Sequence, residues 1–275
     1  MQNQTGEKRK RGRPRKTLAN TAGDTVLALD RGLTVLESLG QMQSATLSSI
    51  ALHVDMPVST VHRILGTLQK HGFADFESDK QEWSIGIGAF KVGSRYLARS
   101  NLIEASLKVM RPLMEQTGET ANLGFSDSGK IIFVSQVETD NPIRAMFRQG
   151  TGSPMHASGI GKAMLASLPL DEVGKMLSRY GQKAFTPHTL TTPERLYQSL
   201  DDIRKLGWSV DNEERYLGMR CVAAAIYNAE GKAIAGLSVS GPSARFLEDD
   251  IAKIGPIIVK AASQLMEITG GVRPA

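Results

Sequence analysis

Apolar residues recur with a helical period in three stretches near the start of the chain. Gly40 follows the first stretch, and Pro57 separates the second from the third, because a proline cannot continue a helix. Thr46 and Ser59 stand where N-cap residues are expected. The pattern therefore predicts three helices, over 25–39, from Thr46 to about 54, and from Ser59 to about 71.

The third predicted helix is amphipathic, with Val61 and Leu65 on its apolar face. Two short apolar runs, 73–76 and 83–85, follow it and flank a polar turn, which predicts a β-hairpin. Three helices and a hairpin in this order are typical of a winged helix-turn-helix, which we predict over 25–88.

A helical pattern over 89–117 then predicts a linker helix, and strands alternate with helices after it. This alternation predicts an α+β domain over 118–270, built on an antiparallel sheet. A break or kink is expected at Gly255-Pro256, inside the last helix. The predicted strands cover 121–127, 130–138, 142–149, 207–213, 220–228 and 233–240, and the predicted helices cover 157–168, 171–180, 192–206 and 247–268.

The composition fits two domains and excludes several classes of protein. A chain of 275 residues is long for one domain, and 41% apolar residues suffice for ordinary cores. No apolar run approaches the roughly 18–20 residues that span a bilayer, and no apolar segment follows the basic N-terminus as in a secretory signal. Cys221 is the only cysteine, which excludes an internal disulfide and fits a reducing compartment. We expect a cytoplasmic protein with no membrane partner.

Positive charge is concentrated at the N-terminus. Residues 1–20 carry a net charge of +6, whereas the whole chain carries +5, so residues 21–275 sum to −1. Residues 1–24 show no hydrophobic periodicity and are expected to form a disordered basic tail. Its Arg-Gly-Arg-Pro core resembles an AT-hook, which would place Arg11, Arg13 and Arg15 in an A/T-rich minor groove. A generic basic tail remains the alternative.

The predicted winged module is acidic, which is unusual for a DNA-binding unit. Residues 25–85 contain four Lys or Arg and seven Asp or Glu, a net charge of −3. Each phosphate neutralised contributes about −0.9 to the slope of log affinity against log salt. We therefore hypothesise that the tail supplies most of the electrostatic attraction to DNA. The polar front of the third helix, with Ser59, Thr60, His62 and Arg63, would then read the operator, and Arg63 could pair bidentately with a guanine.

Several sequence motifs occur together and in a fixed order along the chain. Through these motifs the chain resembles the isocitrate-lyase-regulator (IclR) family of transcription factors along almost its whole length. The stretches that carry the resemblance are Asp30-Arg31-Gly32-Leu33, Pro57-Val58-Ser59-Thr60-Val61-His62-Arg63-Ile64-Leu65, Trp83-Ser84-Ile85-Gly86, Gly118-Glu119-Thr120, Met155-His156-Ala157-Ser158-Gly159-Ile160-Gly161-Lys162-Ala163, Asp211-Asn212-Glu213-Glu214 and Ser238-Val239-Ser240-Gly241-Pro242. The resemblance implies a GAF-like effector domain and assembly into homodimers or homotetramers.

The resemblance is greatest to the glyoxylate-responsive members of the family. Carried over position by position, it implies effector contacts from Gly159, Ile160, Asp211, Cys221, Ser238 and Ser240. Ile160 departs from the alanine that is more frequent there and could narrow the pocket. Ser49 departs from a common glutamate and weakens the capping box at Thr46. Glyoxylate is the first candidate effector, and pyruvate or another short 2-oxo acid is the second.

The expected effector residues offer donors without an Arg or Lys. Backbone N–H groups of the loop 158–161 could face an anion, and Ser238 and Ser240 lie on one face of a strand. Two roles stay open for Asp211: accepting a hydrogen bond from a hydroxyl form of the ligand, or orienting a neighbouring loop. Without the resemblance, a lone buried Cys221 would be interpreted as a small apolar filler.

Two other classes of function fit parts of the sequence. An enzyme is disfavoured because His156 and Ala163 occupy positions where a phosphate-binding loop requires Gly and Ser or Thr. The five histidines lack metal-ligand spacing, and no third partner accompanies a His156 pair with Cys221 or Ser158. We therefore expect no catalytic residue, metal or cofactor. A DNA architectural protein that uses the basic tail is the second alternative. Repressor and activator roles both stay open.

Overall fold

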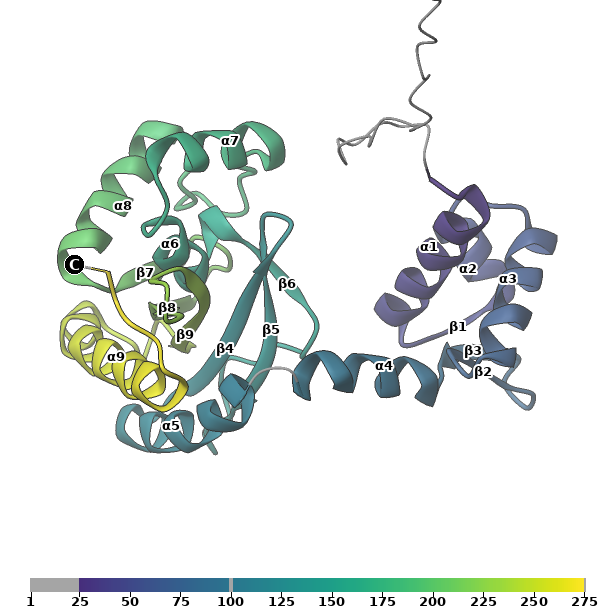
Figure 1. The fold of residues 1–275 in the computed structure, drawn as a ribbon, viewed down its shortest axis with the longest axis horizontal. Coiled ribbons are helices and arrows are strands. Elements are labelled where there is room, and N and C mark those ends of the chain that lie inside the picture. The colour runs from purple at the N-terminus through teal and green to yellow at the C-terminus, as the bar shows by residue number, and fades with distance from the viewer. Residues whose placement is uncertain (1–24, 99–100, 275) are drawn as a thin grey trace, which may run out of the picture. The chain divides into compact units, whose positions relative to one another are not determined.

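The computed structural model describes residues 25–98 and 101–274. The chain divides into two compact units, with the boundary between Tyr96 and Leu97. The elements that begin before this boundary are α1 (Leu27–Met42), β1 (Ser44–Thr46), α2 (Leu47–His53), α3 (Val58–Lys70), β2 (Ala74–Glu77), β3 (Glu82–Ile85) and α4 (Ile87–Ala98), whose last residues cross it (Figure 1).

The first unit is a winged helix-turn-helix, as predicted. Helices α1, α2 and α3 enclose a core with the buried side chains of Leu39, Ile50, Val61 and Leu65. Strands β2 and β3 form the predicted hairpin, and β1 adds a third antiparallel strand in the order β1-β3-β2. Strand β1 was not predicted, because three residues are too few to show a strand period.

The two predicted N-caps have different outcomes. Thr46 caps α2, because its Oγ1 accepts the N–H of Ser49 at 3.3 Å. The prediction that Ser59 caps α3 is wrong: the helix begins at Val58, and Pro57 is its N-cap without a side-chain hydrogen bond. With φ at −56° and ψ at 135°, the proline ring already sets the direction in which the chain enters the helix. Ser59 is therefore free to face solvent.

The second unit has a six-stranded antiparallel sheet in the order β6-β5-β4-β9-β8-β7. This confirms the α+β class with an antiparallel sheet. Its elements are α5 (Asn101–Thr117), β4 (Thr120–Asp127), β5 (Lys130–Val137), β6 (Gly152–Pro154), the 3-10 helix η1 (Met155–Ala157), α6 (Gly159–Leu165), α7 (Leu170–Tyr180), α8 (Pro193–Leu206), β7 (Ser209–Asn212), β8 (Met219–Tyr227), β9 (Ala233–Pro242) and α9 (Glu248–Thr269).

Helices cover both faces of this sheet. Helices α5 and α9 lie side by side on one face, and α6, α7 and α8 lie on the other (Figure 1). Strand β9 shows the division residue by residue. Leu237 and Val239 join the apolar cluster under α5 and α9, whereas Ser238 and Ser240 are buried on the face toward α6. Polar side chains on a buried face require hydrogen-bond partners, and these define the candidate site.

Two predicted elements differ from the structure. The segment predicted as a linker helix contains α4 and α5, and residues 99–100 between them lie outside the described residues. The strand predicted over 142–149 is absent: the ring of Phe147 stacks on Phe133 with centroids 4.4 Å apart, so the segment crosses the sheet face, and β6 takes the sheet edge. Helix α9 continues through Pro256 without the expected break, because buried residues on both sides of the proline hold the helix in place.

Candidate DNA-contacting surface and effector cavity

The polar front predicted for α3 exists, although its members differ in exposure. The side chains of Ser59, His62 and Arg63 are exposed, while Thr60 is half-buried. Thr60 and Arg63 also border a groove between α3 and α1. The opposite face of α3 is fixed in the core by Val61 and Leu65. Arg11, Arg13 and Arg15 lie outside the described residues.

The six residues expected to contact an effector come together around one cavity in the second unit. Its empty space is about 370 Å³, part of it open to solvent. The residues that line it are Phe133, Phe147, Ser153, Ser158, Gly159, Ile160, Asp211, Arg215, Tyr216, Met219, Cys221, Ser238 and Ser240. They come from β5, β6, β7, β8, β9, the start of α6 and two loops. The polar lining groups of the cavity, which are hydroxyls, a carboxyl and a guanidinium, are suited to a small polar ligand.

Strand register explains why residues far apart in the sequence meet here. Asp211 on β7 lies opposite Cys221 on β8, and Cys221 lies opposite Ser240 on β9. Asn122 on β4, which sequence reasoning missed, lies opposite Ser238. Its side-chain Nδ2 is 3.4 Å from Ser238 Oγ and 3.3 Å from Ser240 Oγ. Asn122 therefore orients both serine hydroxyls from the neighbouring strand β4.

The loop that enters α6 approaches the sheet closely. The Ser158 hydroxyl caps α6 by accepting the N–H of Gly161 at 3.1 Å, so this N–H is not available to a ligand. A Cβ at Gly159 would lie 2.8 Å from Cys221 Sγ, which is why a side chain does not fit there. The Ile160 side chain packs over Gly236, where a Cβ would lie 2.4 Å from its Cγ2. Part of the extra volume of Ile160 is thus accommodated against the sheet.

Buried charges lie beside the cavity. Lys162 on α6 forms an ion pair with Glu214, and both side chains are almost completely buried. The N–H of Glu214 donates to Asp211 Oδ1 at 2.8 Å. Burial, together with the nearby Glu214 carboxylate, raises the pKa of Asp211 to about 7. Asp211 can therefore be neutral near physiological pH, and a neutral carboxyl can both donate and accept hydrogen bonds.

Neither Cys221 nor His156 has the surroundings of a catalytic group. Burial and the neighbouring Asp211 raise the pKa of the Cys221 thiol to about 12, so it stays protonated. Burial lowers the pKa of His156, so its ring is neutral, and its Nε2 hydrogen-bonds with the Lys183 carbonyl at 3.0 Å. The site is therefore suited to binding and not to nucleophilic attack.

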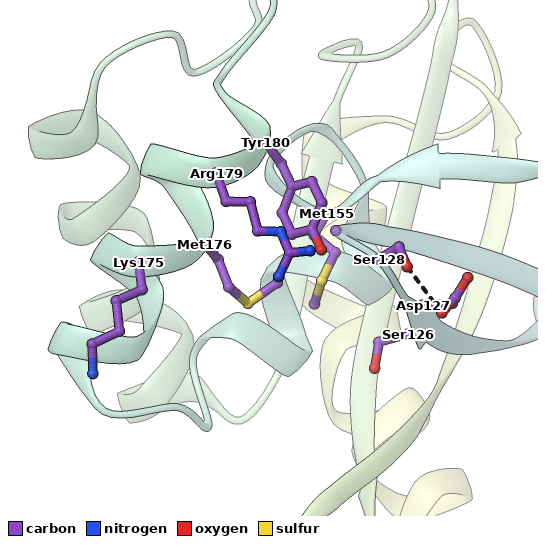
Figure 2. A pocket seen from close by; sticks show the side chains of 9 residues that line it. Ser126, Asp127, Ser128, Met155, Lys175, Met176, Arg179 and Tyr180 are labelled. Atoms are coloured by element: carbon purple, nitrogen blue, oxygen red, sulfur yellow. Dashed lines mark hydrogen bonds between the residues drawn. The ribbon is translucent and has the colours of Figure 1, made fainter. Parts of the chain in front are cut away.

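A larger hollow of about 570 Å³ lies between the β4–β5 turn and α7 (Figure 2). Its two cations already have partners. Lys175 forms an ion pair with Asp171 at 2.9 Å, and the Arg179 guanidinium lies 5.3 Å from the centroid of the Tyr180 ring. None of the predicted effector residues is in it. On chemical grounds the smaller cavity is the better candidate for an effector site.

Within 25–98 and 101–274, no group of three or more His, Cys, Asp or Glu side chains could hold a metal ion. No helix in the same ranges is long and apolar enough to cross a membrane.

Comparison with known proteins gives matches over nearly the whole chain. Residues 28–78 match the IclR helix-turn-helix domain, and residues 94–267 match the bacterial transcriptional regulator IclR C-terminal domain. The chain is 44% identical to the HTH-type transcriptional regulator BhcR of Paracoccus denitrificans, over 94% of this chain and 93% of BhcR. It is 38% identical to the transcriptional repressor IclR of Escherichia coli, over 96% of this chain and 97% of that repressor.

A solved structure leads to the same conclusion. The crystal structure of Thermotoga maritima IclR superposes with a TM-score of 0.72 at 28% sequence identity, covering 90% of this chain and 100% of that one. The matched proteins are regulators of transcription, which confirms the expectation that the chain is not an enzyme. The chain therefore belongs to the IclR family of bacterial transcription regulators, which bind DNA in response to a ligand.

Proposed function

We propose that a small 2-oxo acid, with glyoxylate as the first candidate, occupies the cavity beside Ser238 and Ser240 and changes the affinity of the protein for its operator. The main support is that Gly159, Ile160, Asp211, Cys221, Ser238 and Ser240 line one cavity although they come from four separate segments of the chain. Hydroxyl groups oriented by Asn122 and a carboxyl that can be neutral at pH 7 suit a small oxygen-rich ligand.

On the DNA side, α3 lies in the major groove with Ser59, Thr60, His62 and Arg63 toward the bases and phosphates. The exposure of Ser59, His62 and Arg63 supports this role, and the partial burial of Thr60 limits its reach. Arg11, Arg13 and Arg15 contribute contacts from the tail. The protein acts in the cytoplasm. It assembles as a homodimer or homotetramer, an arrangement that would place two recognition helices on the half-sites of a two-fold symmetric operator.

A mobility-shift assay on the DNA upstream of the protein's own gene tests this proposal. Glyoxylate should change the apparent Kd, by a coupling free energy of about 1–3 kcal/mol, and pyruvate should act more weakly. The direction of the change shows whether the effector weakens or strengthens operator binding. An unchanged Kd with glyoxylate and with pyruvate, at millimolar concentration and constant ionic strength, would contradict the effector class. Light scattering in the same buffer measures the oligomeric state.

A further inference from the structure

The cavity contains one cation that the sequence motifs do not include. Arg215 directly follows the Asp211–Glu214 motif, and it is the only Lys or Arg among the described residues that line the cavity. Its Nε is buried and has no hydrogen-bond partner within the described part of the chain. A buried donor of a charged group without a partner is costly, and an oxygen of a ligand in the adjoining cavity would relieve that cost.

The Arg215 side chain is held in place before any ligand arrives. Its guanidinium carbon lies 3.9 Å from the centroid of the Phe185 ring and 4.9 Å from that of Tyr216. Stacking of this kind restricts the side chain while leaving the N–H donors at the edge of the guanidinium free. A restricted donor loses little conformational entropy when a ligand binds.

The backbone around Arg215 is equally constrained. Thr189 Oγ1 donates to the Glu214 carbonyl at 2.6 Å, and Thr186 Oγ1 donates to the Glu213 carbonyl at 2.7 Å. The Glu213 carboxylate accepts the N–H of Gly218 at 2.7 Å, which closes the loop. The loop that carries Arg215 is thus tied to the 185–189 segment and to itself.

We infer that Arg215 is the residue that recognises the carboxylate of the effector, while Ser238 and Ser240 contact the 2-oxo oxygen of the effector. This inference rests on the proposed function, because it concerns how the same cavity selects an acid. A planar guanidinium suits a carboxylate, and the nearby charges fit: Asp211 can be neutral, and the Glu214 carboxylate is already paired with Lys162. The cavity would therefore bind an acid and discriminate against the matching amide.

Titration calorimetry on the full-length protein, with glyoxylate and its neutral analogue glyoxylamide, tests the inference. The wild type should bind glyoxylate at least about tenfold more tightly than the amide. Arg215→Met should weaken glyoxylate binding by about tenfold to a hundredfold and change amide binding by less than about threefold. Arg179→Met is the matched control, because Arg179 also stacks on an aromatic ring but lines the other hollow (Figure 2). It should leave both affinities unchanged.

The outcomes separate the inference from the proposed function. If Arg215→Met binds glyoxylate as the wild type does, or loses both ligands equally, Arg215 does not recognise the carboxylate and only the inference fails. If the wild type binds neither glyoxylate nor pyruvate, the proposed effector class fails. Arg215→Lys provides a second test in case the Met variant does not fold. The Lys variant keeps the positive charge but lacks the planar guanidinium, so it should retain part of the preference for the acid. Equal binding of acid and amide by a folded Lys variant would also contradict the inference.

Discussion

Lys162 and Glu214 form an ion pair in which the Lys162 side chain is 2% exposed and the Glu214 side chain 6% exposed. The pair joins α6 to the loop that carries Arg215, and residues of both segments line the cavity. Because both charges are out of water, each depends on the other for stabilisation. The geometry of the cavity and the stability of the domain therefore depend on the same contact.

Removal of one partner should be far more damaging than removal of both. Lys162→Met should lower the free energy of unfolding by about 3–5 kcal/mol, because it leaves the Glu214 carboxylate buried without a counter-charge. The double variant Lys162→Met/Glu214→Leu should recover most of this loss. Chemical denaturation followed by circular dichroism measures both. A double variant no more stable than Lys162→Met would show that the pair has a different role.

Effector binding should depend on pH through Asp211. With its pKa raised to about 7, the carboxyl is neutral in the folded protein below that pH and charged above it. An anionic effector is repelled by the charged form, so affinity should be highest below pH 7 and fall by up to about tenfold per unit above it. Asp211→Asn should remove this dependence between pH 6 and 8. Calorimetry in buffers of matched ionic strength measures the effector affinity at each pH. A wild-type affinity as independent of pH as that of Asp211→Asn would contradict the prediction.

Gly159 should tolerate no side chain while Cys221 is present. A Cβ at residue 159 would lie 2.8 Å from Cys221 Sγ and 3.2 Å from Ala223 Cβ. Gly159→Ala should therefore destabilise the protein by about 1–3 kcal/mol through overpacking. Gly159→Ala/Cys221→Ala should be less destabilised, because the sulfur is gone. Gly66→Ala is the control, since no atom lies within 4 Å of its Cβ position, and thermal unfolding should show no loss for it.

Arg63 should contribute to sequence-specific binding of DNA. Arg63→Met should weaken operator binding by about 1–3 kcal/mol while leaving binding to unrelated DNA nearly unchanged, because a base contact carries sequence information. The side chain is exposed, so stability should not change. Arg179→Met controls for loss of one surface charge. Equal weakening on operator and unrelated DNA would instead assign Arg63 to the phosphate backbone.

The basic tail should set the salt dependence. The module 25–85 has a net charge of −3 and the tail 1–20 has +6, so deletion of residues 1–20 should weaken binding and flatten the plot of log Kd against log salt. Each lost phosphate contact should reduce the slope by about 0.9. Fluorescence anisotropy across a salt series measures the slope. An unchanged affinity and slope would show that the folded module supplies its own electrostatic attraction.

Periodic patterns predicted the elements whose two faces have different surroundings. Helix α3 is an example, because Val61 and Leu65 alone fix which side is buried. The resemblance supplied the positions around the cavity. Neither source predicted Asn122, because its contact with Ser238 spans 116 residues and depends on strand register. Arg215 was missed because a single arginine in a loop has no period, and its significance arises only from Phe185 and Tyr216 beside it.

Strand β9 gives the domain a mechanical link between its two layers. A backbone shift of β9 that brings Ser238 and Ser240 closer to a bound ligand also moves Leu237 and Val239. These two side chains pack against α5 on the opposite face of the sheet. A close-packed hydrocarbon layer transmits such a displacement instead of absorbing it. Since α5 is the first helix of the second unit, a shift of β9 on the cavity side would reach the helix that follows the DNA-binding unit in the sequence.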